Sequence, residues 1–127
     1  MIHLIQQLCE LSTAVLHSDG TMIIKEGDTE NLCMYIVLQG NVDVVKNYGK
    51  WDQVVLTQLT AGDFFGEMSL FLSQPRKASV IAAGDVILLE INQDNVQEII
   101  KGNPELLYGI AKTLCNRIEM LNEKIHA

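Results

Sequence analysis

The pattern of apolar and polar residues changes twice along the chain, near residue 17 and near residue 92. Residues 2–16 carry apolar side chains three or four positions apart, which is the spacing of an amphipathic helix. Residues 17–91 instead alternate short β-type runs with glycine-containing turns, and residues 92–127 return to helical spacing. The pattern therefore predicts an N-terminal helix (1–16), a β-region (17–91) and C-terminal helices (92–127), all in one domain (1–127).

The β-region consists of short runs that are separated by turns containing Gly27, Gly40, Gly62 and Gly84. Glycine, asparagine and aspartate suit such turns because they tolerate positive φ or bond their own backbone. Closely spaced strands of this kind are typical of a sandwich, a barrel or a jelly roll, so we expect a mainly β protein with flanking helices. The predicted strands are 21–25, 33–39, 41–46, 53–59, 78–82 and 86–91.

The C-terminal part has signals for two helices. Asn92 can cap a short helix over 93–101, and Gly102 stands where a left-handed residue often ends a helix. Asn103 and Pro104 then suit the N-cap and the first position of a final helix.

The final helix has a heptad pattern of apolar residues, with successive spacings of four and three. This is the pattern of a coiled-coil seam, and it predicts a homodimer. The repeat covers fewer than the three or four heptads that make such an assignment secure, so a helix packed on the β-region is the alternative. The residues of this heptad stripe are Leu107, Ala111, Leu114, Ile118, Leu121 and Ile125.

Length and composition limit the class of protein. A chain of 127 residues corresponds to about one domain, and its apolar fraction of 48% is that of a globular protein. No apolar run approaches the roughly 20 residues that span a bilayer, and the N-terminus lacks the basic region and the small-residue cleavage site of a signal peptide. We therefore expect a cytoplasmic protein with no membrane partner.

Three cysteines and three histidines are scattered along the chain and have no metal-ligand spacing. We expect the thiols of Cys9, Cys33 and Cys115 to be reduced and mostly buried, with no metal and no cofactor. The net charge of −7 opposes binding to phosphate backbones, so nucleic acid is not expected as a partner.

The segment 62–80, called the cassette below, is the stretch with the most candidate chemistry. Gly66 permits close approach of a ligand, and amide groups at a helix start can face an anion. Arg76 offers a planar, two-pronged donor that suits a phosphate, and the Glu67 carboxylate can accept bonds from sugar hydroxyls. Taken singly, Arg76 is more often a loop residue exposed to solvent, and Glu67 a carboxylate favoured at a helix start. Their order in one cassette favours a binding site.

With Gly66-Glu67-Met-Ser-Leu, Pro75-Arg76-Lys-Ala-Ser-Val and the preceding Gly40 and Gly62 turns in place, the chain resembles the cyclic nucleotide-binding domain. That family includes the catabolite activator protein, kinase regulatory subunits and nucleotide-regulated channels. The resemblance extends from about Leu16 to the C-terminus. It implies a double-stranded β-helix (jelly roll) of about eight strands, with an N-terminal helix, a short helix in the cassette and two C-terminal helices.

The resemblance also implies roles for individual residues. The Gly66 backbone and the Glu67 carboxylate would hold ribose hydroxyls, and Arg76 with the Ser69 amide would hold the cyclic phosphate. Ala78 would lie against the ligand. The remaining residues expected at the ligand are Met68, Lys77 and Ser79 in the cassette, and Leu114 or Ile118 as the apolar cover of the base.

Lys77 departs from relatives that prefer cyclic GMP, which tend to have a threonine directly after the arginine. A threonine hydroxyl can bond both phosphate and guanine, whereas an ammonium group only donates. This departure favours cyclic AMP and leaves an unusual anionic ligand open.

The expected function is a sensor, without enzyme activity, that couples capture of a cyclic nucleotide to movement of its C-terminal helices. One alternative is a degenerate sensor of the same fold that binds another small anion or no ligand. A cupin-like metalloenzyme is a further alternative, but it needs histidines and carboxylates clustered on strands. The activator branch has a DNA-reading helix-turn-helix after the last helix, and the 127 residues contain none. A stand-alone sensor, a piece of a longer regulator and a dimerising module therefore stay open.

Overall fold

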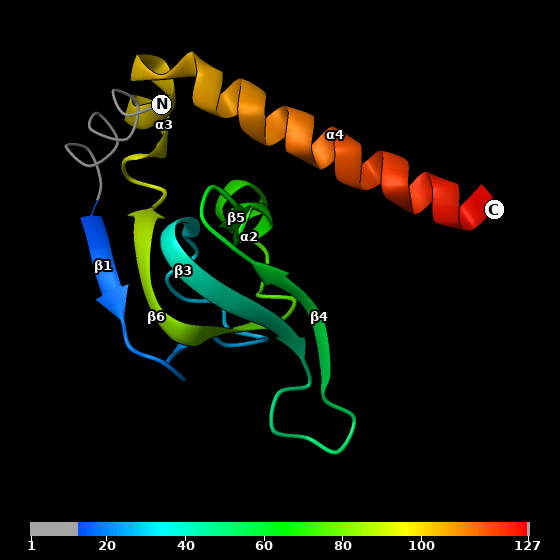
Figure 1. Ribbon diagram of the computed structural model, residues 1–127. Coiled ribbons are helices and arrows are strands. Elements are labelled where there is room, and N and C mark those ends of the chain that lie inside the picture. The colour runs from blue at the N-terminus through cyan, green and yellow to red at the C-terminus, as the bar shows by residue number, and fades with distance from the viewer. Residues whose placement is uncertain (1–12, 127) are drawn as a thin grey trace. The chain divides into compact units, whose positions relative to one another are not determined.

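The computed structural model describes residues 13–126 and contains two compact units. The first unit ends at Asn95 and holds the strands and the cassette, and the second begins at Val96 and holds two helices. Figure 1 shows these elements, and each unit is described by itself below.

The first unit is a six-stranded antiparallel sheet in the described residues, with the strand order β1-β6-β3-β4. β2 pairs with β6 and β5 pairs with β3, so the two long strands, β3 and β6, hold the others together (Figure 1). The mainly β jelly-roll class predicted above is confirmed. The strands are β1 (Thr13–His17), β2 (Met22–Ile24), β3 (Met34–Lys46), β4 (Val54–Leu59), β5 (Phe64–Phe65) and β6 (Ser79–Ile91).

β3 and β6 each replace two predicted strands. Gly40 and Gly84 were expected to separate strands, but each lies inside one of these strands with φ of +95° and +84°. The β3–β6 register shifts around Gln39 and Asn41, so the pairing resumes on the far side of Gly40. When β3 and β6 are each counted as two at these glycines, the six strands become the eight expected of the jelly roll. Only glycine fits at position 40, because an added Cβ would lie 2.5 Å from the Asp85 carbonyl oxygen.

The prediction of an N-terminal helix over 1–16 is wrong for residues 13–16. β1 is a strand whose residues from Thr13 to His17 pair with β6 from Glu90 to Val86. Burial alternates along it: Ala14 and Leu16 are exposed, whereas Val15 is half-buried. A short apolar run such as Ala-Val-Leu fits either period, and here the sheet edge decides. The rest of the predicted helix, residues 1–12, lies outside the described residues.

The core of the first unit is formed by side chains of β2, β3, β5 and β6. Tyr35 of β3 stacks on Phe65 of β5, with ring centroids 5.1 Å apart and planes inclined by 23°. This stack fixes β5, the strand of the cassette that directly precedes Gly66 and α2. The buried cluster contains Ile24, Cys33, Tyr35, Val37, Val42, Phe65, Val80, Ala82, Val86 and Leu88.

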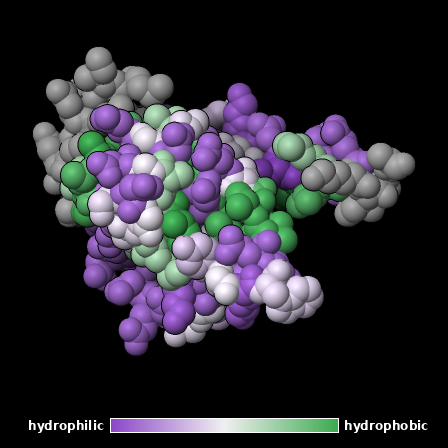
Figure 2. All heavy atoms as spheres, turned by 60° about the horizontal axis from the view of Figure 1, so that its bottom comes forward, coloured by the Kyte–Doolittle hydropathy of each residue, from purple (hydrophilic) through white to green (hydrophobic). Residues whose placement is uncertain are grey.

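β4 differs from the other strands because it is the last in the strand order and is exposed along most of its length. Val54, Val55 and Leu56 are each more than half exposed, and Trp51 in the hairpin before them is 98% exposed. Figure 2 shows strongly apolar residues gathered at the surface on the face in view. The first unit therefore has apolar surface outside its core.

The second unit contains α3 (Val96–Gly102) and α4 (Pro104–His126), which are the two predicted C-terminal helices. Pro104 occupies the first position of α4 as expected, but Gly102 belongs to α3 and does not have a positive φ. Asn103 is therefore the single residue between the two helices, and its side-chain Nδ2 atom donates to the Ile99 carbonyl oxygen. No helix in the part of the chain that the structure describes is long and apolar enough to cross a membrane.

The heptad stripe of α4 is largely exposed. Leu107, Ile118 and Leu121 are 44%, 57% and 58% exposed, and Leu114 is half-buried. The side chain of Ile125 lies outside the described residues. The predicted homodimer is untested by a single chain and stays a prediction.

Candidate functional site

The cassette contains β5, the first two residues of β6 and, between them, α2 (Glu67–Leu72), the short helix expected there. Gly66 immediately precedes α2 and has a left-handed backbone with φ of +83°. A Cβ at this position would lie 2.7 Å from Arg76 Nη1 and 2.8 Å from the Cys33 carbonyl oxygen. Position 66 therefore requires glycine for two reasons, its backbone conformation and the close approach of the arginine.

The cassette buries polar groups that proteins usually leave exposed. Glu67, Ser69, Arg76 and Ser79 are 6%, 5%, 6% and 3% exposed. Burial of a charge is costly unless hydrogen bonds or an opposite charge compensate for it. The cassette thus buries one acidic side chain, Glu67, and one basic side chain, Arg76. Charged side chains are usually exposed, so this burial is unusual.

Arg76 is compensated by backbone carbonyl groups. Its Nη2 atom donates to the carbonyl oxygens of Asn31 at 2.9 Å and Cys33 at 2.7 Å. Its Nη1 atom donates to the Gly66 carbonyl oxygen at 3.2 Å. Three carbonyls from two distant segments therefore hold the guanidinium in place.

These bonds limit the ways in which the Arg76 guanidinium can bind an anion. A guanidinium has two edges that present a pair of parallel N–H groups, and both edges use an Nη2 hydrogen. The Nη2 atom already donates to two carbonyl oxygens, those of Asn31 and Cys33. A two-pronged contact with a phosphate therefore requires that Arg76 release at least one of these carbonyls.

The other predicted cassette residues have different environments. The Ser79 hydroxyl accepts a bond from the Glu26 amide at 3.0 Å and so supports the wall of the cassette. Lys77 is exposed and its carbonyl accepts a bond from Lys46 Nζ at 2.9 Å, Ala78 is half-buried and Met68 is 46% exposed. Leu114 and Ile118 lie on α4 in the second unit, and their role stays a prediction.

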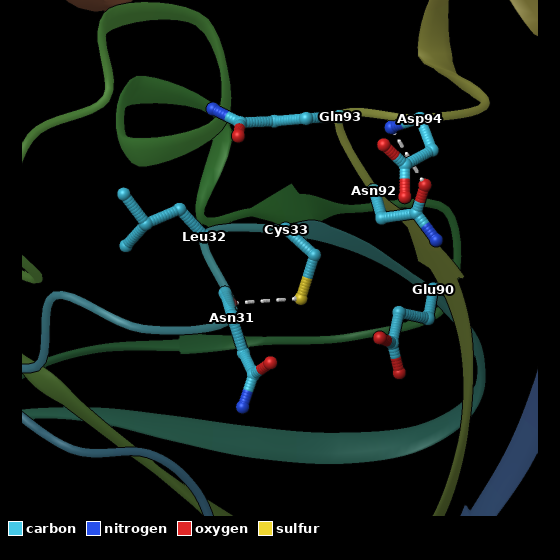
Figure 3. A pocket seen from close by; sticks show the side chains of 7 residues that line it. All are labelled: Asn31, Leu32, Cys33, Glu90, Asn92, Gln93 and Asp94. Atoms are coloured by element: carbon cyan, nitrogen blue, oxygen red, sulfur yellow. Dashed lines mark hydrogen bonds between the residues drawn. The ribbon is translucent and has the colours of Figure 1, made fainter.

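A cavity of about 300 Å³ lies beside the segment that holds Arg76, and no predicted site residue lines it. Figure 3 shows the Cys33 thiol and the Glu90 carboxylate facing the hollow, whereas the Gln93 side chain points away from it toward α2. Burial raises the pKa of the Cys33 thiol, so this cysteine is protonated at neutral pH. The lining residues are Asn31, Leu32, Cys33, Glu90, Asn92, Gln93 and Asp94.

Asn31 and Cys33, the partners of Arg76, are not among the residues predicted from the sequence. They act through carbonyl groups, which every residue has, so residue type gives no signal. Asn31 does have a left-handed backbone with φ of +52°, a conformation that asparagine tolerates better than most residues. This is the only hint that its identity provides.

Comparison with known proteins shows the family of the chain. A family model described as "Cyclic nucleotide-binding domain" matches residues 15–103. The chain belongs to the cyclic nucleotide-binding domain family.

Individual relatives differ in what surrounds the matched domain. The cAMP-activated global transcriptional regulator CRP of Salmonella typhimurium is 30% identical over 109 residues, which are 85% of this chain and 51% of the regulator. A cGMP-dependent 3',5'-cGMP phosphodiesterase A of Dictyostelium discoideum is 36% identical over 121 residues, or 93% of this chain and 13% of the phosphodiesterase. The chain thus spans at most about half the length of these curated relatives.

Among solved structures, the catabolite activator protein of Thermus thermophilus matches with a TM-score of 0.85 and 24% identity. The match covers 98% of this chain and 58% of that protein. This likeness supports the fold.

Proposed function

We propose that this chain is a regulatory module that binds a cyclic nucleotide in the cassette, and that the nucleotide is cyclic AMP. The observation that carries the proposal is Arg76: a guanidinium that is 6% exposed and lies against the backbone of Gly66, directly before α2. A buried cation held at a glycine that has no room for a side chain suits an anion that approaches the backbone closely.

The proposed contacts divide between the two ends of the ligand. Arg76 and the Ser69 amide hold the cyclic phosphate, and the Glu67 carboxylate with the Gly66 backbone holds the ribose hydroxyls. Ala78 contacts the ligand, and Met68, Lys77 and Ser79 lie next to it. Because the Ser79 hydroxyl already bonds the Glu26 amide, its part is to shape the wall.

Ligand binding exchanges one set of acceptors for another. The phosphate oxygens replace the Asn31 or Cys33 carbonyl at Nη2, and the released carbonyl turns to solvent or to the adjoining cavity. Charge-assisted bonds to a phosphate are stronger than bonds to neutral carbonyls, so the exchange favours the bound state.

Cyclic AMP is proposed over cyclic GMP because Lys77 provides no hydroxyl to a guanine base. Relatives are named for each nucleotide: the Salmonella regulator is cAMP-activated and the Dictyostelium phosphodiesterase is cGMP-dependent. A chain with Lys77 directly after Arg76 keeps the phosphate contact and lacks the extra guanine contact.

The proposed response is a movement of α3 and α4, with Leu114 or Ile118 covering the base and the heptad stripe pairing with a second copy. A ligand can shift such an equilibrium only by its different affinity for the two arrangements. The exposed stripe of α4 is the surface that favours a homodimer.

Isothermal titration calorimetry with cyclic AMP, cyclic GMP and 2'-deoxy cyclic AMP tests this proposal. We expect a micromolar Kd for cyclic AMP, which is about −8 kcal/mol of binding free energy, and a weaker Kd for cyclic GMP. The 2'-deoxy compound lacks a hydroxyl that Glu67 would bond, so it should bind about tenfold more weakly. Absence of heat with all three compounds would exclude the proposal.

A second candidate function is a sensor of this fold that binds another small anion or no ligand. The observation that favours it is that Arg76 Nη2 already donates to two backbone carbonyls of the same chain. In that case titration with inorganic phosphate gives the same result as titration with the nucleotides.

A further inference from the structure

The side chain of Gln93 joins the end of the cassette helix to the segment that leads into the second unit. Its Nε2 atom donates to the Leu70 carbonyl oxygen at 3.1 Å and to the Ser73 hydroxyl oxygen at 3.1 Å. Both hydrogens of the amide are therefore used. The orientation of the amide is defined, because a carbonyl oxygen can only accept.

These two bonds fall where α2 needs partners. The last four carbonyls of a helix lack intrahelical donors, and Leu70 is within the last turn of α2, which ends at Leu72. Ser73 follows with a left-handed backbone of φ +53° and ψ +39°, which is unfavourable for a serine. The helix also has no basic residue in its last turn, so Gln93 is the donor that stabilises this end.

Gln93 itself belongs to a tight turn, residues 92–95. Asn92 Oδ1 accepts from the amides of Asp94 and Asn95 at 2.9 and 3.0 Å, and Asn95 Oδ1 accepts from the Asn92 amide at 3.0 Å. This reciprocal pattern makes the 92–95 turn a rigid unit. Val96, the first residue of α3, follows it directly.

We propose that Gln93 is the positioning residue that transmits movement of α2 to the 92–95 turn and hence to α3. The N-terminal end of α2 carries Gly66 and Glu67, and its C-terminal end is held by Gln93. A six-residue helix moves as one body, so a shift at the ligand end displaces the Leu70 carbonyl and pulls the Gln93 side chain. The inference rests on the proposed function for the identity of the ligand but not for the mechanical link.

Amide hydrogen–deuterium exchange with and without cyclic AMP tests the inference. In the wild type we expect the nucleotide to change exchange of the 92–95 turn and of α3. Gln93→Leu keeps the size of the side chain and removes the donor, so it should lower that change by about half or more while altering the nucleotide Kd less than about threefold. Gln93→Lys restores a donor toward the Leu70 carbonyl and should restore the change.

Gln97→Leu is the matched control, because it makes the same substitution four residues later on α3. It should leave the ligand-dependent change as in the wild type. An unaltered change in Gln93→Leu, or a loss that Gln93→Lys does not restore, would overturn the inference.

A ligand-free arm separates this inference from the proposed function. Met68 is exposed, and Met68→Gly should weaken α2 because glycine is a poor helix former. This substitution should speed amide exchange in the 92–95 turn when Gln93 is present. It should have no such effect in the Gln93→Leu background. If no cyclic nucleotide binds, the proposed function fails and this arm alone decides the link. Equal effects of Met68→Gly in both backgrounds would overturn it.

Discussion

In the cassette, charged and polar side chains are buried, whereas in α4 large apolar side chains are exposed. Arg76 and Glu67 are both 6% exposed, but Ile118 and Leu121 are 57% and 58% exposed. Each case departs from the usual distribution of residues, and each departure has a cost. The cassette compensates its buried cation within one chain, through three carbonyls. The exposed apolar stripe of α4 has no such compensation in its own side chains, which is why we propose that it pairs with a second copy.

The cassette and the α4 stripe therefore need different tests. The contacts of Arg76 are internal to the first unit, so single substitutions there change binding or stability directly. The proposed role of the α4 stripe is to pair with a second copy, so its test is the oligomeric state.

Gly66→Ala should be strongly destabilising because it combines a left-handed backbone with a collision. The added Cβ would lie 2.7 Å from Arg76 Nη1 and 2.8 Å from the Cys33 carbonyl oxygen. We expect a loss of about 3 kcal/mol or more in the free energy of unfolding, measured by urea denaturation.

Gly84→Ala is the control that measures the cost of a left-handed backbone without a collision. Its φ of +84° matches the +83° of Gly66, but nothing lies within 4 Å of an added Cβ. It should cost about 1–2 kcal/mol. Equal losses in the two variants would show that the close packing of Gly66 against Arg76 contributes nothing to stability.

Leu121→Asp should convert a dimer to a monomer in analytical ultracentrifugation, because a carboxylate in a coiled-coil seam must be desolvated. Met120→Asp is the matched control: Met120 is 59% exposed and Leu121 is 58% exposed, but Met120 lies outside the heptad stripe. We expect Met120→Asp to remain dimeric. If Leu121→Asp has the sedimentation coefficient of the wild type, the stripe is not the dimer seam.

Glu26→Gln should have the smallest effect, and the effect should depend on pH. The Asn47 amide and the Lys46 ammonium lower the pKa of the Glu26 carboxyl, with contacts of 3.0 and 3.1 Å. A carboxyl whose pKa is lowered on folding stabilises the protein above the pKa of the unfolded state and loses that contribution as the pH falls through the folded pKa. The variant should therefore unfold more easily than the wild type at pH 7, and the difference should shrink as the pH falls through the lowered pKa of the folded state.

Glu30→Gln serves as the control for Glu26→Gln, because Glu30 is exposed and its substitution removes the same charge from the same region. Thermal denaturation from pH 3 to pH 7 measures both variants. A difference between Glu26→Gln and the wild type that stays constant over this range would contradict the assigned cause.

Much of the fold could be predicted from local pattern, but the predictions failed where two periods compete or where a glycine does not end a strand. Residues 13–16 fit a helix by spacing, yet they pair with β6 because the sheet provides backbone partners that local sequence cannot reveal. Gly40 and Gly84 have the positive φ expected of turn residues, but the strands continue through them. Local propensity describes one residue at a time, whereas the residues of β1 and β3 that pair with β6 lie 34 to 77 positions away from their partners.

The candidate site shows the same limit. Gly66, Glu67 and Arg76 could be predicted because their side chains, or the lack of one, carry the chemistry. The carbonyls of Asn31 and Cys33, and the link from Gln93 to Leu70, could not be predicted because they join distant segments through backbone groups. A pattern of residue types contains no information on which carbonyl a buried guanidinium meets.

The central claim is that Arg76 holds the phosphate of a cyclic nucleotide, and calorimetric titration of the wild type and Arg76→Ala tests it most directly. Lys50→Ala, in the β3–β4 hairpin, controls for the loss of one positive charge, and a thermal melt verifies that each variant is folded. We predict that Arg76→Ala weakens cyclic AMP binding by about 2 kcal/mol, or roughly 30-fold, while Lys50→Ala binds like the wild type. Equal cyclic AMP affinity of folded Arg76→Ala and the wild type would contradict the claim.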